Sequence, residues 1–213
     1  MKTGLFITFE GGEGSGKSTQ IQMLKKYFED QGRKVLLTRE PGGSEGAEEI
    51  RNILLKGATD RWDKKTEILL FCAARRNHLE KKVKPALEKG EIVLSDRFHD
   101  STVAYQCFGY GYDEKTYQDI ANLYQFIADD FRPDLTVLLD IDPEVGIMRS
   151  IKRAGNDEQR FENMNLEFHK NIREGFLTLA KKEPERFIVV NANQPIDAVH
   201  NEIIEKMQGI IKW

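Results

Sequence analysis

The chain has 213 residues, of which 39% are hydrophobic and 31% charged, with a formal net charge of −3 at pH 7. This length fits one domain with a single sizeable core, and the composition is typical of a water-soluble globular protein. Because 32 basic residues are balanced by 35 acidic ones, we expect no non-specific binding to nucleic acid.

The hydrophobic segments and the cysteines exclude further classes. No apolar run is long enough to span a bilayer, and the N-terminal Met-Lys-Thr-Gly leads directly into a predicted strand, so we expect no membrane span and no signal peptide. Cys72 and Cys107 form no CxxC motif and cannot build a four-cysteine metal site. We therefore expect a cytoplasmic protein whose cysteines fill apolar space.

Short apolar runs alternate with longer amphipathic segments along the chain. The predicted strands are Leu5–Phe9, Val35–Thr38, Ile92–Ser95, Leu135–Asp140 and Phe187–Val190. The predicted helices are Lys17–Asp30, Gly46–Leu55, Thr66–Leu87, Tyr117–Ala128, Pro143–Ser150, Phe161–Lys181 and Ile196–Ile211. This alternation predicts an α/β fold in one domain, residues 1–213: a doubly wound, five-stranded parallel sheet flanked by helices. Ligands of such sheets bind beyond the carboxyl ends of the strands.

A phosphate-binding loop follows the first predicted strand. Residues 11–18 are Gly-Gly-Glu-Gly-Ser-Gly-Lys-Ser, a complete G-x-x-x-x-G-K-[ST] motif between a strand and a helix. The glycines let backbone N–H groups point at a triphosphate, and the helix adds its positive N-terminal end. Lys17 would reach the β- and γ-phosphates, and the hydroxyl of Ser18 would bind Mg²⁺. The nucleotide-binding set is Gly11, Gly12, Glu13, Gly14, Ser15, Gly16, Lys17, Ser18 and Thr19.

Charged residues also follow the second and third predicted strands. Arg39 and Glu40 follow the second strand, before a Pro-Gly-Gly turn that begins at Pro41. Asp96 and Arg97 follow the third, where an acid could complete the metal site of a phosphate-loop protein, although adjacent charges are often only an exposed ion pair. Asp140 ends the fourth strand in the same way, so periodicity does not choose between Asp96 and Asp140.

A cationic cluster follows the fourth strand. Arg149, Lys152 and Arg153 are spaced to share one side of a helix end, and Gly-Asn-Asp at 155–157 breaks the helix before Arg160. Most charge runs are solvated helix faces. Beside a phosphate loop, however, this cluster fits a short mobile lid, about residues 149–161, that brings positive charge to a transferring phosphoryl group.

Five segments resemble motifs of the thymidylate kinase family, in the same order and across essentially the whole chain. They are Phe-Glu-Gly at 9–11, Thr-Arg-Glu-Pro-Gly-Gly at 38–43, Leu-Phe-Cys-Ala-Ala-Arg at 70–75, the segment 96–106, and Arg-Phe-Glu at 160–162. Segment 96–106 is the most specific, because many unrelated enzymes share the phosphate loop. The resemblance implies a phosphate-loop nucleoside monophosphate kinase fold with a short lid, and a homodimer. It also implies transfer of the γ-phosphoryl of ATP to the 5′-phosphate of dTMP, yielding dTDP and ADP, with Mg²⁺ and without a covalent intermediate.

The resemblance also assigns the acceptor side. Phe71 stacks on the thymine and Arg75 bonds to it, and their i, i+4 spacing lets both meet one flat ligand. Arg39 and Arg97 clamp the acceptor phosphate, and Glu10 and Asp96 organise the metal and acceptor side. Ser101, Tyr105 and Gln106 line the deoxyribose and base. The full substrate-binding set is Glu10, Arg39, Pro41, Phe71, Arg75, Arg97, Ser101, Tyr105 and Gln106.

On the donor side, bacterial-type members of the family supply lid arginines in place of an arginine in the phosphate loop. The chain resembles that type, because it has Glu13 in the loop and Arg149, Arg153 and Arg160 in the lid segment. A carboxylate beside phosphates needs a cation nearby, and Arg153 is the best candidate to face the phosphoryl group. The resemblance implies that the catalytic residues are Lys17, Arg97, Arg153, Asp96 and Glu13. It adds Arg149 and Arg160 to the nucleotide-binding set. The implied metal site consists of Ser18, Glu10 and Asp96.

The chain departs from the family pattern at two positions. Tyr110 stands where the family usually has an arginine, and Gln159 where an acid commonly precedes the lid arginine. Two alternatives remain open: a small kinase acting on another nucleotide or nucleoside, and a nucleotide-dependent switch or motor subunit. Against a GTPase switch, the chain has no Asn-Lys-x-Asp motif.

Overall fold

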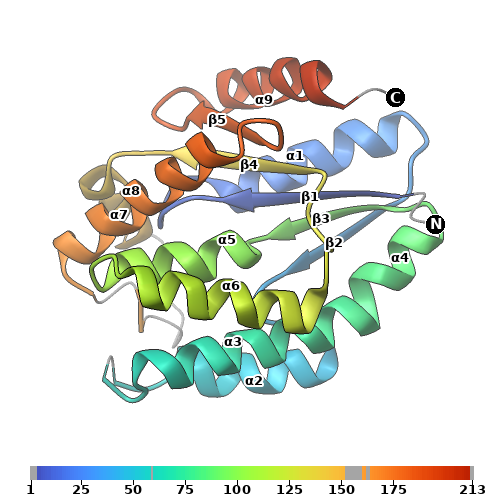
Figure 1. Ribbon diagram of the computed structural model, residues 1–213. Coiled ribbons are helices and arrows are strands. Elements are labelled where there is room, and N and C mark those ends of the chain that lie inside the picture. The colour runs from blue at the N-terminus through green and yellow to red at the C-terminus, as the bar shows by residue number, and fades with distance from the viewer. Residues whose placement is uncertain (1–3, 59, 152–159, 162–163, 212–213) are drawn as a thin grey trace.

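A parallel sheet forms the centre of the computed structural model, which describes residues 4–58, 60–151, 160–161 and 164–211 (Figure 1). Within those ranges the sheet has five strands in the order β2-β3-β1-β4-β5. The strands are β1 (Leu5–Glu10), β2 (Val35–Arg39), β3 (Ile92–Asp96), β4 (Leu135–Asp140) and β5 (Phe187–Asn191). The predicted five-stranded parallel sheet is confirmed, and every strand except β4 extends one residue further at its carboxyl end than predicted.

Helices cover both faces of the sheet. They are α1 (Lys17–Asp30), α2 (Glu45–Leu55), α3 (Lys64–His78), α4 (Lys84–Glu88), α5 (His99–Thr102), α6 (Glu114–Ala128), α7 (Pro143–Ile151), α8 (Leu166–Lys182) and α9 (Ile196–Ile210), with π-helical segments η1 (Leu79–Val83) and η2 (Val103–Gly109). In Figure 1, α1 and α9 lie over one face, and α3, α4, α5 and α6 lie over the other. Among the described helices, none has the length and apolarity needed to cross a membrane.

The core has two layers because successive strand residues point to opposite faces. Phe6 packs with residues of α3, α4, α6, α8 and the two π-helical segments on one face, whereas Ile7 packs with α1 and α9 on the other. Both residues are fully buried. The sheet register places Asp96 opposite Phe9 of β1 and Arg39 of β2, so the carboxyl ends of three strands meet at one edge.

Three predicted helices differ from the observed ones by two or more residues at an end, and one helical segment was not predicted. The helix predicted over Tyr117–Ala128 begins three residues earlier, at Glu114, because the Asp113 side chain caps it. The helix predicted over Phe161–Lys181 begins at Leu166, because Asn165 caps it by accepting a hydrogen bond from the backbone N–H of Phe168. The helix predicted over Thr66–Leu87 begins two residues earlier, behind the capping carboxylate of Asp63, and continues through η1 into α4. The segment α5–η2 gave no periodic signal because all seven residues of η2 are buried.

Candidate active site

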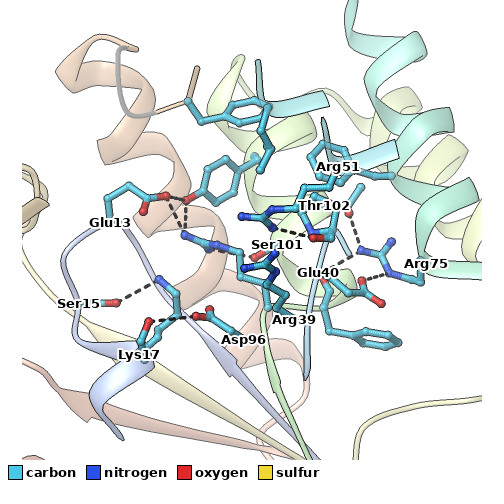
Figure 2. Close-up of a pocket in the computed structure, with 18 of the residues that line it drawn as sticks. Glu13, Ser15, Lys17, Arg39, Glu40, Arg51, Arg75, Asp96, Ser101 and Thr102 are labelled. Carbon is cyan, nitrogen blue, oxygen red and sulfur yellow. Dashed lines mark hydrogen bonds and ion pairs between the residues drawn. The ribbon is translucent and has the colours of Figure 1, made fainter. Parts of the chain in front are cut away.

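One cavity opens at the carboxyl ends of β1, β2 and β3, with a volume of about 390 Å³. Its lining residues come from the phosphate loop, the segment after β2, helix α3, the end of β3 and the α5–η2 segment. Figure 2 shows Glu13, Ser15 and Lys17 on one side and Glu40 and Arg75 on the other, with Arg39 and Ser101 between them. Phosphate-binding side chains therefore share a cavity with the residues predicted to hold a base.

The phosphate loop packs so closely on its neighbours that two of its positions admit only glycine. A Cβ atom on Gly11 would lie 2.5 Å from the backbone oxygen of Leu139, and one on Gly14 would lie 2.0 Å from that of Gly146. Both residues also have positive φ angles, 137° and 65°. The loop backbone is thereby fixed between β1 and α1, where Ser18 and Thr19 belong to the first helical turn.

Lys17 is held inside this loop. Its side-chain ammonium donates to the backbone oxygens of Gly11 and Gly12 at 3.1 and 3.0 Å. The residue is only 8% exposed. Burial and the nearby guanidinium of Arg97 lower the pKa of Lys17. Backbone carbonyl groups of the loop therefore fix the position of the Lys17 ammonium.

The geometry distinguishes the two acids that the sequence left open. The hydroxyl of Ser18 donates to Asp96 Oδ2 at 3.4 Å, so these oxygens lie together at the start of α1. Asp140 instead accepts two hydrogen bonds, of 2.7 and 2.8 Å, from Arg173 of α8. Among the described residues, no cluster of three or more His, Cys, Asp or Glu side chains could hold a metal ion by itself.

Glu10 lies behind the cavity wall. Its two carboxylate oxygens accept hydrogen bonds from the backbone N–H of Phe98 at 2.8 Å and from the Ser101 hydroxyl at 2.5 Å. The residue is fully buried, and burial together with the nearby carboxylate of Asp100 raises its pKa to about 8. Through these two hydrogen bonds, Glu10 at the end of β1 holds the start of the α5–η2 segment in place.

Arg97 connects the donor and acceptor sides. Its guanidinium donates to the Gly11 backbone oxygen at 3.0 Å, to Ser101 Oγ at 3.1 Å, and to both Glu13 Oε1 and the Tyr105 hydroxyl at 2.8 Å. Burial would lower the pKa of Arg97, but Tyr105 and Glu13 raise it above its ordinary value. The backbone has a φ angle of 69°, a left-handed conformation that non-glycine residues seldom adopt and that often marks functional sites.

Glu13 has a counter-ion inside the cavity. It accepts from Arg97 and, at 2.7 Å, from the Tyr105 hydroxyl. Burial would raise the pKa of Glu13, but Arg97, Lys17 and Tyr105 together lower it to about 2. Glu13 is therefore a carboxylate at neutral pH, and its ion-pair partner, Arg97, follows β3.

Two of the three predicted lid arginines, Arg149 and Arg160, lie in the described part of the chain, and the partners of their guanidinium groups are residues other than Glu13. Arg149 donates to the Ala192 backbone oxygen and to Asn193, at 3.1 Å each, after β5. Arg160 is buried, pairs with Glu67 of α3 and donates to the Ala58 backbone oxygen at 3.0 Å. Neither lines the main cavity. Arg153 and Gln159 lie outside the described residues.

The predicted base-binding residues lie at the end of the cavity next to α3. Phe71 and Gln106 line it, together with the ring of Phe161, whose centroid is 6.2 Å from that of Phe71. Arg75 is 2% exposed; its Nε donates to Glu40 at 2.7 Å and its Nη2 to Thr102 at 2.9 Å. Burial would lower the pKa of Arg75, but Glu40 raises it.

Arg39 and Pro41 also line the cavity, and Arg39 pairs with Glu48 of α2 at 3.1 Å in a largely exposed contact. Together, the structure gathers Lys17, Glu13, Asp96, Arg97, Arg39, Phe71, Arg75, Ser101, Tyr105 and Gln106 around one cavity.

Sequence reasoning missed three residues that organise this end of the cavity. Glu40 was noted only for its place after the second strand and in a family motif, and Glu67 and His78 were given no role. His78 Nδ1 lies 2.9 Å from Glu40 Oε1, and because a carboxylate can only accept, that nitrogen carries the proton. Its Nε2 forms a hydrogen bond of 2.6 Å with the Thr38 hydroxyl. The i, i+3 spacing of Arg75 and His78 on one helix was the available signal.

The sheet order, the phosphate loop after β1 and the shared cavity define a phosphate-loop kinase of the nucleoside monophosphate kinase type. The family model described as thymidylate kinase matches residues 9–203. The chain belongs to the thymidylate kinase family, which confirms the resemblance seen in its motifs.

Similar proteins support this assignment over nearly their full lengths. The chain is 50% identical to a thymidylate kinase of Magnetococcus marinus over 206 residues, covering 97% of this chain and 96% of the relative. It is 46% identical to one of Ruegeria pomeroyi, covering 95% and 94%. A crystal structure of thymidylate kinase from Ehrlichia chaffeensis superimposes with a TM-score of 0.77 at 37% identity, covering 96% of this chain and 99% of that one. The chain is an ATP-dependent kinase that phosphorylates dTMP to dTDP.

Proposed function

We propose that the cavity holds dTMP against the phosphate loop and that the γ-phosphoryl group of ATP passes to it directly, in line and without a covalent intermediate. One observation carries this proposal: Lys17 of the loop and Arg97 beside β3 line the same cavity as Phe71 and Arg75. A donor phosphate on the loop and an acceptor phosphate on Arg97 would lie at adjoining positions, as in-line transfer requires.

The proposed donor site is built from the loop and the start of α1. Backbone N–H groups of residues 11–16 and the N-terminal end of α1 favour the phosphates, and Lys17 would bind their β- and γ-oxygens. Arg149 and Arg160 remain proposed contributors, and Arg153 remains the proposed phosphoryl-facing residue. The lid of residues 149–161 and the single-domain organisation of residues 1–213 are part of the same proposal.

Mg²⁺ fits the oxygen donors beside the loop. Ser18 Oγ and Asp96 Oδ2 lie 3.4 Å apart, and Mg²⁺ is usually held by one or two protein oxygens together with waters and substrate phosphates. When bound, Mg²⁺ would neutralise charge on the donor phosphates. Both oxygens of Glu10 are bonded to Phe98 and Ser101, so its support for the metal side is proposed to be indirect.

The proposed acceptor site clamps a phosphate at one end and a base at the other. Arg39 and Arg97 would bind the phosphate, with Pro41 and Ser101 in the adjoining wall. Tyr105 would lie against the sugar, and Phe71, Arg75 and Gln106 would contact the base. Because the acceptor is already an anion, the reaction needs no strong general base, and positioning with charge neutralisation supplies the rate enhancement.

The proposed partners are ATP, dTMP and a second copy of the chain. Leu69 of α3 is 55% exposed, Phe126 of α6 is 84% exposed and Ile53 of α2 is 41% exposed. Helix α3 packs against both α2 and α6, so the three side chains belong to one helical layer (Figure 1). A second copy covering this face would bury them and form the homodimer. We place the enzyme in the cytoplasm, where ATP is available to it.

Two measurements test the proposal. ADP release from ATP and Mg²⁺ should be far faster with dTMP than with AMP, GMP or CMP, and should stop when a chelator removes the metal. Transfer from ATP with a chiral, isotopically labelled γ-phosphoryl group should invert its configuration. Retention of configuration would indicate two successive displacements and would overturn the direct transfer.

A further inference from the structure

Glu67 is a fully buried carboxylate in the first turn of α3. It accepts hydrogen bonds from three side chains: Gln106 Nε2 at 3.1 Å, the Tyr110 hydroxyl at 3.5 Å, and the guanidinium of Arg160. Arg160 supplies the counter-charge that a buried carboxylate needs. Because Glu67 does not line the cavity, any effect it has on a nucleotide passes through another residue.

Gln106 is that residue. It is fully buried and lines the cavity. An ionised carboxylate has no proton to donate, so the Gln106 amide must turn its NH₂ group toward Glu67. The opposite orientation would bring two acceptor oxygens together in a buried place. Its carbonyl oxygen Oε1 is left buried, without a hydrogen-bond partner among the residues that the structure describes.

Arg75 carries the complementary unpartnered atom. Its Nε and Nη2 are bonded to Glu40, Phe98 and Thr102, whereas its Nη1 is buried without a hydrogen-bond partner in the described ranges. Arg75 and Gln106 line the same cavity, beside the ring of Phe71. Among the described residues, two side chains of the cavity wall therefore carry a buried unsatisfied donor and a buried unsatisfied acceptor, and buried polar groups in native proteins are normally paired.

We propose that Glu67 determines base specificity by fixing the orientation of the Gln106 amide. A carbonyl at Gln106 and an N–H at Arg75 match the N3–H donor and O4 acceptor of thymine or uracil. The same pair opposes cytosine, whose N3 accepts and whose exocyclic amine donates. This proposal rests on the proposed function, in which Arg75 and Gln106 contact the base, and adds a positioning residue that touches no substrate.

The test is Glu67→Gln, measured as the ratio of kcat/KM for dUMP to that for dCMP. These substrates differ only at the hydrogen-bonding edge of the base. The new amide can donate as well as accept, so it permits the Gln106 amide to turn over and present its NH₂ group to cytosine. We expect the dUMP to dCMP ratio to fall at least about tenfold, which corresponds to ~1.4 kcal/mol. A ratio of two substrates does not change with the fraction of folded enzyme.

Matched variants separate orientation from general disturbance. Tyr110→Phe removes a different hydrogen bond to the same carboxylate and should leave the ratio unchanged. Glu67→Gln removes the buried carboxylate that pairs with Arg160. The double variant Glu67→Gln with Arg160→Gln, which removes both charges of this pair, is therefore the second test and should show the same fall.

Gln106→Leu distinguishes failure of this inference from failure of the proposed function. If Gln106→Leu lowers the ratio while both Glu67 variants keep it within about threefold of wild type, Gln106 contacts the base but Glu67 does not orient it. If Gln106→Leu leaves the ratio unchanged, the base-contacting role in the proposed function fails, and the inference fails with it.

Discussion

The ion pair between Glu40 and Arg75 should be one of the most costly to break in this molecule. Both side chains are almost completely buried, with 3% and 2% of their surfaces exposed, and the pair is 2.7 Å long. Glu40→Gln keeps the shape of the side chain but leaves the guanidinium in the interior without a counter-charge. Removing one partner of a buried pair typically costs about 3–5 kcal/mol.

This free energy converts into a large change in melting temperature. In a chain of 150–250 residues each kcal/mol lowers Tm by about 2–4 °C, so Glu40→Gln should lower it by about 6–20 °C. The matched control is Asp30→Asn, which breaks a pair of 2.8 Å between Lys26 and Asp30 whose side chains are 75% and 62% exposed. An exposed pair contributes at most about 1 kcal/mol, so the control should lower Tm by no more than about 4 °C.

The assay is thermal unfolding followed by circular dichroism, with KM for each nucleotide measured on the folded protein. We expect KM for dTMP to rise in Glu40→Gln, because Arg75 loses the carboxylate that orients it, and KM for ATP to change little. A fall in Tm as small as that of Asp30→Asn would refute the argument that burial makes this pair critical. Equal changes in KM for both nucleotides would refute the link from Glu40 through Arg75 to the base.

Four further predictions follow from the site. Lys17→Ala should reduce kcat to less than about a tenth of the wild-type value, since phosphate clamps are worth several kcal/mol in the transition state, and a more active variant would contradict the proposed donor site. Phe71→Ala should weaken dTMP binding by about 1–3 kcal/mol in titration calorimetry without affecting ATP, and equal losses for both would instead indicate a packing role. Wild-type enzyme should have a higher kcat/KM for dUMP than for UMP. Tyr105→Ala should reduce that preference, because removing the ring makes room for the 2′-hydroxyl of UMP. An unchanged preference would show that Tyr105 is not the residue that discriminates against ribose. Burial would raise the pKa of Glu13, but Arg97 and Lys17 lower it from an ordinary value of 4.5 to about 2. The charged form of Glu13 therefore stabilises the fold fully above about pH 4.5, and this stabilisation is lost as the pH falls toward 2. The free energy of unfolding lost in Glu13→Gln, measured with urea, should therefore be larger at about pH 7 than at about pH 3.5, and equal losses would count against the depressed pKa.

The features that the sequence predicted correctly are those encoded locally. Each strand is a short apolar run, and the phosphate loop is one continuous motif, so neither requires knowledge of distant contacts. The helical segment α5–η2 was missed for a physical reason. All seven residues of its longer part, η2, are buried, so the alternation of apolar and polar residues that reveals an amphipathic helix is absent there.

The features that the sequence could not settle depend on long-range partners. Asp140 differs from Asp96 because Arg173, 33 residues further along the chain, occupies its carboxylate. Arg160 is held by Glu67 from 93 residues away, and no local pattern encodes that pairing. Tyr110, the residue that replaces a family arginine, also bonds to Glu67. The positions of such side chains follow from the folded sheet and not from spacing along the chain.

The contact between Glu13 and Arg97 predicts that the affinities of the two nucleotides are coupled. Glu13 belongs to the loop proposed to hold ATP, whereas Arg97 is proposed to hold the phosphate of dTMP, and the two side chains are 2.8 Å apart. A nucleotide that shifts the loop changes the partners of Arg97, and so changes the free energy with which the other nucleotide binds. Thermodynamic linkage then requires reciprocity: whatever factor ATP applies to the affinity for dTMP, dTMP applies to the affinity for ATP. A dissociation constant for either substrate is therefore defined only at a stated concentration of the other.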